Sequence, residues 1–277
     1  MKIRQSLVKY ILFGLTLCLS FAVHADMLIS PTRVLMDHEN KSTTMVLRNN
    51  SNGSRTYRLS WEDKRATEDG GYNMVSESEE WPSAKDMIRV SPRQITVGPN
   101  ENQTVRFNWR PPADLPSGEY RSHLLLQVIP DISEPTSTLG AETSQEGVGI
   151  QVFMQMSFSI PVVVRHDTEA PQITMESIKA VPTKNSQRMG LEMVFNRTGN
   201  ASSFGKISVE MQRDANSPVE VISQSKELSI YPEIDKRTFT IPLSEASIPE
   251  GAFVRVAYEG AKEYEGILWA EQVFQAE

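Results

Sequence analysis

Few residues of this 277-residue chain combine the types and the spacing that catalysis or metal binding requires. Beyond the first 25 residues there are three histidines, His38, His123 and His166. None has another histidine at metal-ligand spacing, and the sequence has no HExxH-type pair. No serine stands in a G-x-S-x-G motif, so a serine hydrolase of that kind has no support. We therefore expect no metal site, no cofactor and no enzymatic activity.

Paired acids are the other residues that could do chemistry, because two carboxylates serve as acid and base in glycosidases. Glu79 and Glu80 are such a pair, but serines and Trp81-Pro82 flank them. Nothing around them indicates the burial that would raise a carboxyl pKa, so a solvated loop is the favoured interpretation.

Residues 1–25 are predicted to be a secretory signal peptide. The basic start Met1–Lys9 precedes an apolar run, Tyr10–Val23, that is too short to span a membrane, and Ala25 completes an acceptable cleavage site. The only cysteine, Cys18, lies inside this segment. The mature chain is therefore expected to contain no disulfide, no thiolate metal site and no cysteine nucleophile.

Composition and charge narrow the function classes further. Hydrophobic residues make up 39% of the chain and charged residues 23%, which is a globular composition. Removal of the leader would leave 25 basic and 35 acidic residues, and the resulting net charge of −10 disfavours nucleic acid and anionic lipid as partners. No later apolar run approaches membrane length, so we expect no membrane insertion and a location in a bacterial periplasm.

The elements that must position any site are β-strands, because apolar residues alternate with polar ones along most of the chain. Tyr57–Trp61 and Thr104–Trp109 are examples, and Tyr120–Ile129, which follows the turn at Pro116-Ser117-Gly118, is a further predicted strand. Short strands separated by turn signals at this spacing are typical of antiparallel sandwiches. The segment 165–172 has the composition of a linker, which predicts one all-β domain over 26–164 and a second over 173–277.

The strongest pattern is a run of eight apolar residues at strict two-residue spacing, which predicts a strand of about fifteen residues, well beyond the usual length. The run consists of Val148, Ile150, Val152, Met154, Met156, Phe158, Ile160 and Val162. A polar segment, Pro130–Gly147, precedes it and is predicted to be a mobile loop. The predicted strand covers residues 148–163.

Two interpretations of this strand are open. It could be a central core strand, which is the commonest reason for alternation. Its length, the polar segment before it and its adaptable methionines favour a strand that also pairs with another protein, because a long apolar edge strand aggregates unless it has a dedicated partner. Pairing a strand with a client's open sheet is β-strand addition.

Several motifs of the first domain resemble those of the PapD-like periplasmic pilus chaperones. Asn49-Asn50 followed by Tyr57–Trp61 is similar to that family's Asn-Asn … Tyr-Leu-x-x-Trp pattern. Ser91-Pro92-Arg93 … Gly98-Pro99 … Val105-Arg106 resembles its Pro-Pro … Pro-Gly … Val-Arg stretch, and Leu115-Pro116 … Ile129-Pro130 its Leu-Pro … Ile-Pro stretch. The long alternating strand lies where the donor strand of that family should be. The second domain resembles the family only by position.

This resemblance implies two Ig-like antiparallel β-sandwich domains in a boomerang arrangement. It also implies a chaperone that binds pilus subunits lacking their last strand and delivers them to an outer-membrane usher, with no nucleotide or other cofactor. The donor strand would lay five side chains into the subunit's groove: Val148, Ile150, Val152, Met154 and Met156. The free protein could also self-associate to cover this strand.

The resemblance further implies two basic residues that hold the subunit's terminal carboxylate. The family's arginine matches Arg33, and a guanidinium holds a carboxylate bidentately and so fixes strand register. The family's lysine is absent, because Pro161 occupies its position, and Arg121 is the candidate for the second cation. An interdomain cluster is predicted to contain three further residues: Glu119, Arg165 and Glu259.

One alternative function is a secreted Ig-like pilus or adhesin subunit that is itself assembled into a fibre. A subunit would be one short domain with an extension to donate, whereas here the alternating strand lies in the middle of the chain. Recovery of the protein from surface fibres would favour this alternative.

Overall fold

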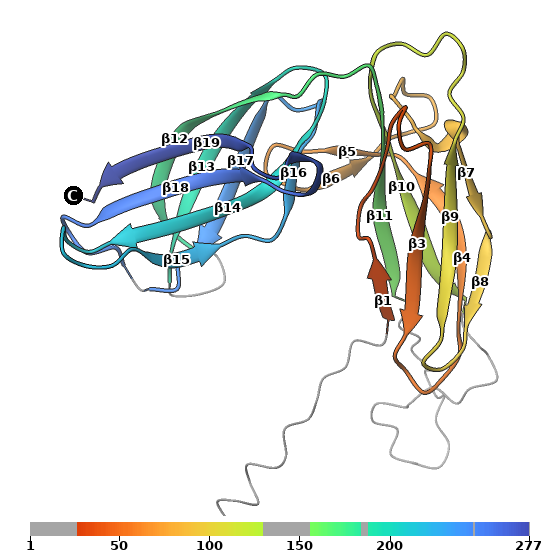
Figure 1. The fold of residues 1–277 in the computed structure, drawn as a ribbon, viewed down its shortest axis with the longest axis horizontal. Coiled ribbons are helices and arrows are strands. Elements are labelled where there is room, and N and C mark those ends of the chain that lie inside the picture. Colours follow the sequence, from red (N-terminus) through yellow and green to blue (C-terminus); the bar gives the residue numbers. More distant parts are fainter. Residues whose placement is uncertain (1–26, 130–155, 184–187, 246, 277) are drawn as a thin grey trace, which may run out of the picture.

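The computed structural model describes residues 27–129, 156–183, 188–245 and 247–276. In these ranges the chain forms two elongated β domains whose long axes lie at an angle to one another, so that the molecule is L-shaped (Figure 1). The only helical pieces there are two short 3₁₀ turns, η1 (Lys85–Met87) and η2 (Lys262–Tyr264). Within the same ranges, no helix is long and apolar enough to cross a membrane.

The first domain is a sandwich of two sheets, one with the strand order β1-β3-β9-β7 and the other with the order β2-β11-β10-β4-β8. Its strands are β1 (Met27–Ser30), β2 (Val34–Met36), β3 (Ser42–Asn49), β4 (Arg55–Glu62), β7 (Ile88–Ser91), β8 (Gln94–Val97), β9 (Asn102–Trp109), β10 (Gly118–Ile129) and β11 (Ser157–His166). A separate hairpin consists of β5 (Lys64–Ala66) and β6 (Tyr72–Met74).

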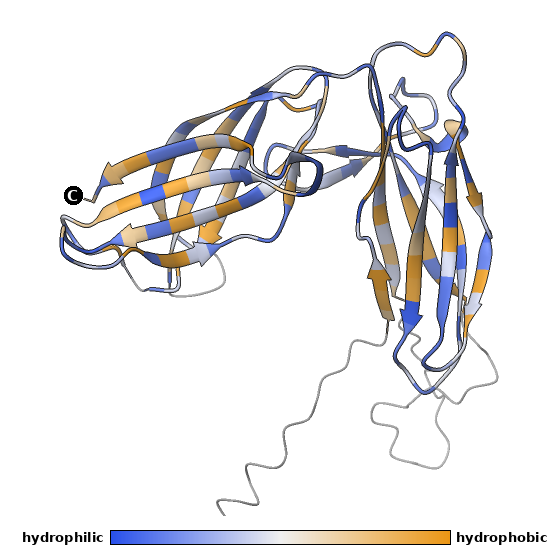
Figure 2. Ribbon diagram, in the orientation of Figure 1, coloured by the Kyte–Doolittle hydropathy of each residue, from blue (hydrophilic) through white to orange (hydrophobic). Residues whose placement is uncertain are grey.

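The core of this domain is built by the alternation predicted from the sequence. Met45 and Leu47 of β3 and Phe107 of β9 are fully buried, while the residues between them face solvent. Leu124 and Leu126 of β10 come from the opposite sheet and join the same cluster. Along β9 the alternation of orange and blue is visible in Figure 2. Burial of alternate side chains between the two sheets is what holds a sandwich together.

The second domain is also all-β. Its strands are β12 (Gln172–Pro182), β13 (Met189–Thr198), β14 (Ser203–Gln212), β15 (Glu220–Gln224), β16 (Leu228–Ile230), β17 (Lys236–Pro242), β18 (Phe253–Gly260) and β19 (Leu268–Gln275). One sheet has the order β12-β13-β17, and the other has the order β15-β14-β18-β19 with β16 paired to β14. Met193 and Phe195 of β13 pack in one core with Ile207, Val209 and Tyr258 of the facing sheet.

The chain passes from one sheet to the other between β1 and β2, which brings Arg33 to the side of the domain that faces the second domain. β1 pairs antiparallel with β3, and a few residues later β2 pairs parallel with β11. Arg33 lies in the crossover between β1 and β2. Its position therefore follows from the path of the chain between the two sheets.

Strand β11 is the described part of the long alternating run. Phe158 is half-buried, and Ile160 and Val162 are buried in the core of the first domain. Met156 is 63% exposed just before the strand begins. The predicted donor positions Val148, Ile150, Val152 and Met154 lie outside the described residues, as does the predicted loop 130–147.

The pairing of β11 leaves part of one margin open. β10 pairs with β11 along its whole length, from Ser157 to His166. On the other margin β2 pairs only with residues 162–164. Within the part of the chain that the structure describes, no strand pairs with residues 157–161 on that side. This is the geometry that a strand available for β-addition requires.

Candidate functional site

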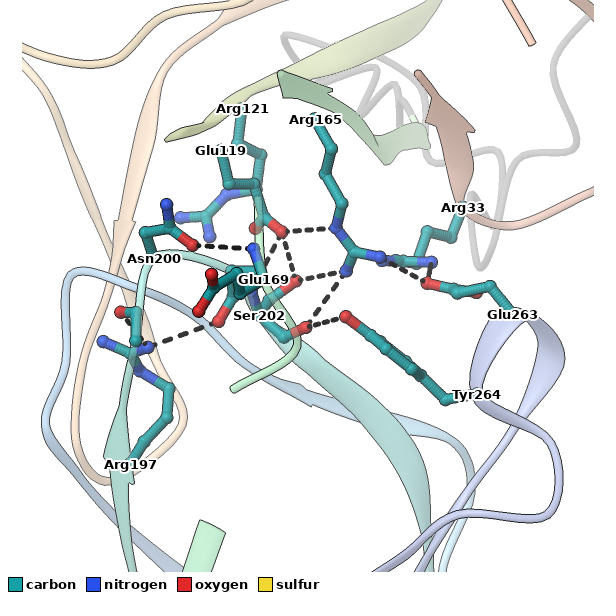
Figure 3. A network of polar contacts seen from close by, with 12 residues as sticks. Arg33, Glu119, Arg121, Arg165, Glu169, Arg197, Asn200, Ser202, Glu263 and Tyr264 are labelled. Atoms are coloured by element: carbon teal, nitrogen blue, oxygen red, sulfur yellow. Dashed lines mark hydrogen bonds and ion pairs between the residues drawn. The ribbon is translucent and has the colours of Figure 1, made fainter. Parts of the chain in front are cut away.

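A buried network of polar contacts joins the two domains beside β11 (Figure 3). The Glu119 side chain is completely buried, and its Oε2 accepts a hydrogen bond from Arg165 Nε at 3.0 Å. The same oxygen accepts hydrogen bonds from the backbone N and the Oγ of Ser202, at 2.9 and 2.8 Å. Arg165 Nη2 in turn donates to the Ser202 carbonyl at 3.0 Å. The Glu119 carboxylate of the first domain thus accepts hydrogen bonds from donors on both domains.

Two of the three residues predicted for this cluster are in it, but Glu259 is not. Glu259 lies on β18 and is half-exposed, with Arg255 Nη2 at 3.5 Å from its Oε1. Glu263 of η2 takes the expected place, because its Oε1 is 2.8 Å from Arg33 Nη1 and 3.5 Å from Arg165 Nη1. The η2 turn brings Glu263 to the interface.

Arg33 has the surroundings of a group that can bind a further anion. Its side chain is 10% exposed, and its guanidinium lies over the ring of Phe204, 4.5 Å from the centroid. Glu263 occupies Nη1, whereas Nε and Nη2 are buried and have no hydrogen-bond partner among the described residues. A buried donor without a partner is costly, so these two N–H groups favour the binding of an acceptor.

Arg121 is engaged in a different way from the one we expected. Its side chain is 3% exposed, its guanidinium forms an ion pair with Glu233 of the second domain, and Nη2 donates to the carbonyl of Lys64 at 2.8 Å. The guanidinium also stacks on Tyr231, 3.5 Å from the ring centroid. Arg121 therefore lies within the domain interface, with its guanidinium engaged by Glu233, Lys64 and Tyr231.

A cavity of about 300 Å³ lies between the domains. Its lining includes Arg33, Tyr72 and Pro161 of the first domain together with Phe204 and Arg237 of the second. Arg237 Nη1 donates to the carbonyl of Thr67 at 3.0 Å, and its Nε is buried with no partner among the described residues. Burial lowers the pKa of Arg237 from its usual value. Arg237 is thus a second cation at the cavity, which the sequence reasoning missed.

The hairpin β5–β6 fixes the relation of the two domains. The Asp69-Gly70-Gly71 turn predicts a hairpin, and the structure confirms it, with β5 and β6 paired antiparallel. Ala66 at its end is buried in the core of the second domain, and its N–H donates to Glu233 Oε1 at 2.8 Å. The Thr238 N–H donates to the carbonyl of Glu68 at 2.8 Å. The hairpin therefore packs on both domains, and Figure 1 shows β5 and β6 reaching from the first domain toward the second.

His123 is a buried histidine behind the cavity. It lies on β10 between Pro161 of β11 and Glu62 of β4, and its ring meets that of Tyr72 edge-on, with 5.3 Å between centroids. Burial, with the charges of Arg121 and Lys64, lowers the pKa of His123 to about 3. The ring is therefore neutral in the folded protein over most of the pH range.

Acidification is expected to destabilise the protein through this histidine. Unfolding restores a His123 pKa of about 6.5, so the unfolded chain binds a proton that the folded chain does not, and stability is lost as the pH falls below about 6.5. Between pH 7 and pH 5 this amounts to about 2 kcal/mol. His123→Phe keeps an aromatic ring beside Tyr72 and should remove this part of the pH dependence.

The measurement is urea unfolding of both proteins at pH 7 and pH 5. The loss between the two pH values should be about 2 kcal/mol smaller for His123→Phe than for the wild type. Equal losses in the two proteins would show that His123 takes up its proton in the folded state.

The chain resembles solved fimbrial chaperones in structure. No family model matches the sequence, and no curated protein matches it. The YadV chaperone is 12% identical at a TM-score of 0.45, with 91% of this chain and 100% of that chain covered. The CupB2 chaperone of Pseudomonas aeruginosa is 15% identical at a TM-score of 0.44, with 90% and 99% covered. A chain of the Salmonella enterica complex of the SafA pilin with the SafB chaperone is 13% identical at 0.45, with 90% and 95% covered.

Proposed function

We propose that this chain is a periplasmic chaperone that binds pilus subunits by donor-strand complementation and delivers them to an outer-membrane usher. The observation that carries the proposal is the open margin of β11 at residues 157–161, on a strand whose apolar run continues upstream in the sequence. An unpaired strand margin offers backbone donors and acceptors to a second protein, and alternate side chains provide selectivity. The motifs of the first domain support the same function.

In this proposal the subunit forms a strand beside β11 and receives its upstream apolar side chains. Met156 is exposed just ahead of β11, where it can enter a pocket of the partner, and its flexible thioether fits irregular gaps. The other donor positions are Val148, Ile150, Val152 and Met154. Ile160 and Val162 stay in the chaperone's own core and hold the strand in place.

The subunit's terminal carboxylate is proposed to bind at the interdomain cavity. Arg33 supplies the unpartnered Nε and Nη2 as a fork, and Arg237 replaces the absent lysine as the second cation at the same cavity. Lys64 is a weaker candidate, because Glu62 neutralises it at 2.9 Å. A fixed end point sets the register of the paired strands, and a slip by one residue would turn every donated side chain to the wrong face.

The anchor is tested by Arg33→Ala in cells that express the protein's own pilus operon. Hydrogen bonds to charged groups contribute about 1.5–3 kcal/mol, so the amount of subunit that co-purifies from periplasmic extracts should fall by roughly tenfold or more. Arg237→Ala should act in the same direction. Arg106→Ala is the matched control, because Arg106 is an exposed arginine on β9, away from the cavity.

Mass spectrometry of the co-purified proteins identifies the partner. The variant chaperone should remain folded, because Glu263 keeps its contact with Arg165 when Arg33 is removed. Normal subunit recovery with Arg33→Ala would refute the anchoring role. Finding the protein itself built into surface fibres would refute the chaperone function.

A further inference from the structure

Two of the three histidines meet at the end of the first domain, contrary to the expectation from their separation in the sequence. β2 and β11 run parallel, with Met36 opposite Val164. His38 and His166 each lie two residues further along, so the parallel pairing brings them side by side at the same end of the sheet. Asp167 directly follows His166. Parallel pairing can join residues far apart in sequence, which is why local spacing gave no signal.

The side chains of these three residues converge. His38 Nε2 is 2.5 Å from His166 Nδ1 and 3.9 Å from Asp167 Oδ1, and His166 Nε2 is 3.7 Å from Asp167 Oδ2. One ligand atom from each residue lies within 4.8 Å of the others. Among the described residues, no other trio of histidine and acidic side chains is gathered in this way.

The surrounding backbone holds the trio in place. Asp167 has a φ of 49°, a left-handed conformation that aspartate tolerates better than most residues, and its carbonyl accepts a hydrogen bond from Ser117 Oγ at 2.5 Å. On the other side, Asp37 Oδ1 accepts hydrogen bonds from the backbone N–H groups of Glu39 and Asn40, at 2.9 and 2.7 Å, which forms the turn that carries His38.

The ring of Trp109 supports His38 from the core side, edge-on, with 5.1 Å between centroids. The opposite side is open, because the side chains of His38 and Asp167 are 44% and 71% exposed. An ion can therefore reach the trio from solvent, and small rotations of these two side chains adjust the ligand distances.

We propose that His38, His166 and Asp167 form a binding site for a divalent transition metal of the Zn²⁺ or Cu²⁺ type. Two imidazole nitrogens and a carboxylate oxygen are ligands that these ions take, at about 2.0–2.2 Å for zinc. A tetrahedral ion at those distances needs its ligand atoms about 3.3 Å apart, whereas His38 Nε2 lies 2.5 Å from His166 Nδ1 and 3.9 Å from Asp167 Oδ1, and one ligand atom from each of the three residues lies within 4.8 Å of the others. Water would complete the coordination from the open side.

A metal at this position would join the ends of two strands. β2 has three residues and is the only described strand that covers this margin of β11, and Asp167 begins the segment that leads to the second domain. A shared ion would hold β2 against β11 and fix the start of the linker. The proposal is independent of the proposed function, because it concerns the far end of β11 from the open margin.

The test uses the mature protein without an affinity tag, first stripped with EDTA and then titrated with ZnCl₂ by calorimetry. One ion per chain is expected, together with a rise in the thermal unfolding midpoint. Cobalt substitution gives an independent signal, because Co²⁺ held at a four-coordinate protein site absorbs visible light much more strongly than aqueous Co²⁺. His38→Asn, His166→Asn and Asp167→Asn should each weaken zinc binding at least tenfold, since even the loss of an outer-sphere partner costs about 10–100-fold.

Glu39→Gln is the matched control, because this exposed acid stands next to His38 but is not one of the three proposed ligands. It should bind zinc as the wild type does. Circular dichroism separates loss of binding from loss of fold. Wild-type protein that binds no zinc at about 1 mM, or His38→Asn protein that binds it with wild-type affinity, would overturn the proposal.

Discussion

Glu119→Ala is expected to lower the free energy of unfolding by about 3–5 kcal/mol, because it breaks a buried ion pair and leaves the other charge without its partner. The Glu119 side chain is fully buried and Arg165 is 10% exposed, so water cannot replace the lost contact. The Ser202 N–H and hydroxyl lose their acceptor as well. The neighbouring Glu263 lies 3.5 Å from Arg165 and offers only partial compensation.

The effect should be visible in both stability and domain arrangement. Urea unfolding measures the loss of free energy, and small-angle scattering should show a larger radius of gyration as the interface loosens. Glu119→Gln keeps an oxygen that can accept from Ser202 and should lie between the wild type and the alanine variant. Glu245→Gln removes the acid of an exposed ion pair with Arg213 and should cost less than about 1 kcal/mol. If Glu119→Ala costs no more than this control, the buried network does not hold the domains together.

The strands of the fold could be predicted from the sequence because their signal is local. A strand that packs one face on a core must alternate, and β9 begins only two residues before the predicted strand and ends where predicted. The bounds of β10 agree equally well, because turn residues precede it in the sequence. The alternation of apolar residues in the long run likewise predicts β11, and alternate residues from Phe158 to Val162 pack inward. Alternation cannot show which margin of a strand stays unpaired, because that depends on where β2 ends.

The residues of the candidate site were harder to predict, because they meet across the two domains. Arg33 and Glu263 are 230 positions apart, and only the relative placement of the domains brings them together. The sequence does not distinguish Glu259 from Glu263 as a candidate for the cluster. In the structure, the η2 turn brings Glu263 to the interface. The same reason explains why Arg237 gave no sequence signal.

The motif resemblance points to Arg33 position by position, and Arg33 does lie at the interdomain cavity, whereas its role as a carboxylate anchor stays a prediction. It gave no guidance where the chain departs from the family pattern. Pro161 stands at the lysine position, so the family pattern does not identify the second cation, and Arg121 is predicted only from its place on the neighbouring strand. The contact with Glu233 shows that a buried cation on that strand can serve the domain interface instead.

The second large effect is expected at this contact. Arg121→Met should lower the free energy of unfolding by about 3–5 kcal/mol, because it leaves Glu233 as a charge, 14% exposed, without its partner. The methionine can still fill the space over Tyr231, so the loss reports on the unpaired charge more than on packing. Glu233 cannot turn away freely, because it also accepts the Ala66 N–H of the hairpin.

The double variant Arg121→Met with Glu233→Gln separates these contributions. Glutamine removes the charge but keeps an oxygen for the Ala66 N–H, so the double variant should be more stable than Arg121→Met alone, with a coupling energy of about 1–3 kcal/mol. Urea unfolding of the wild type, both single variants and the double variant completes the cycle. If the two losses simply add, Arg121 and Glu233 do not act as a pair. Arg121 would then contribute to the interface only through its hydrogen bond to the Lys64 carbonyl and its stacking on Tyr231.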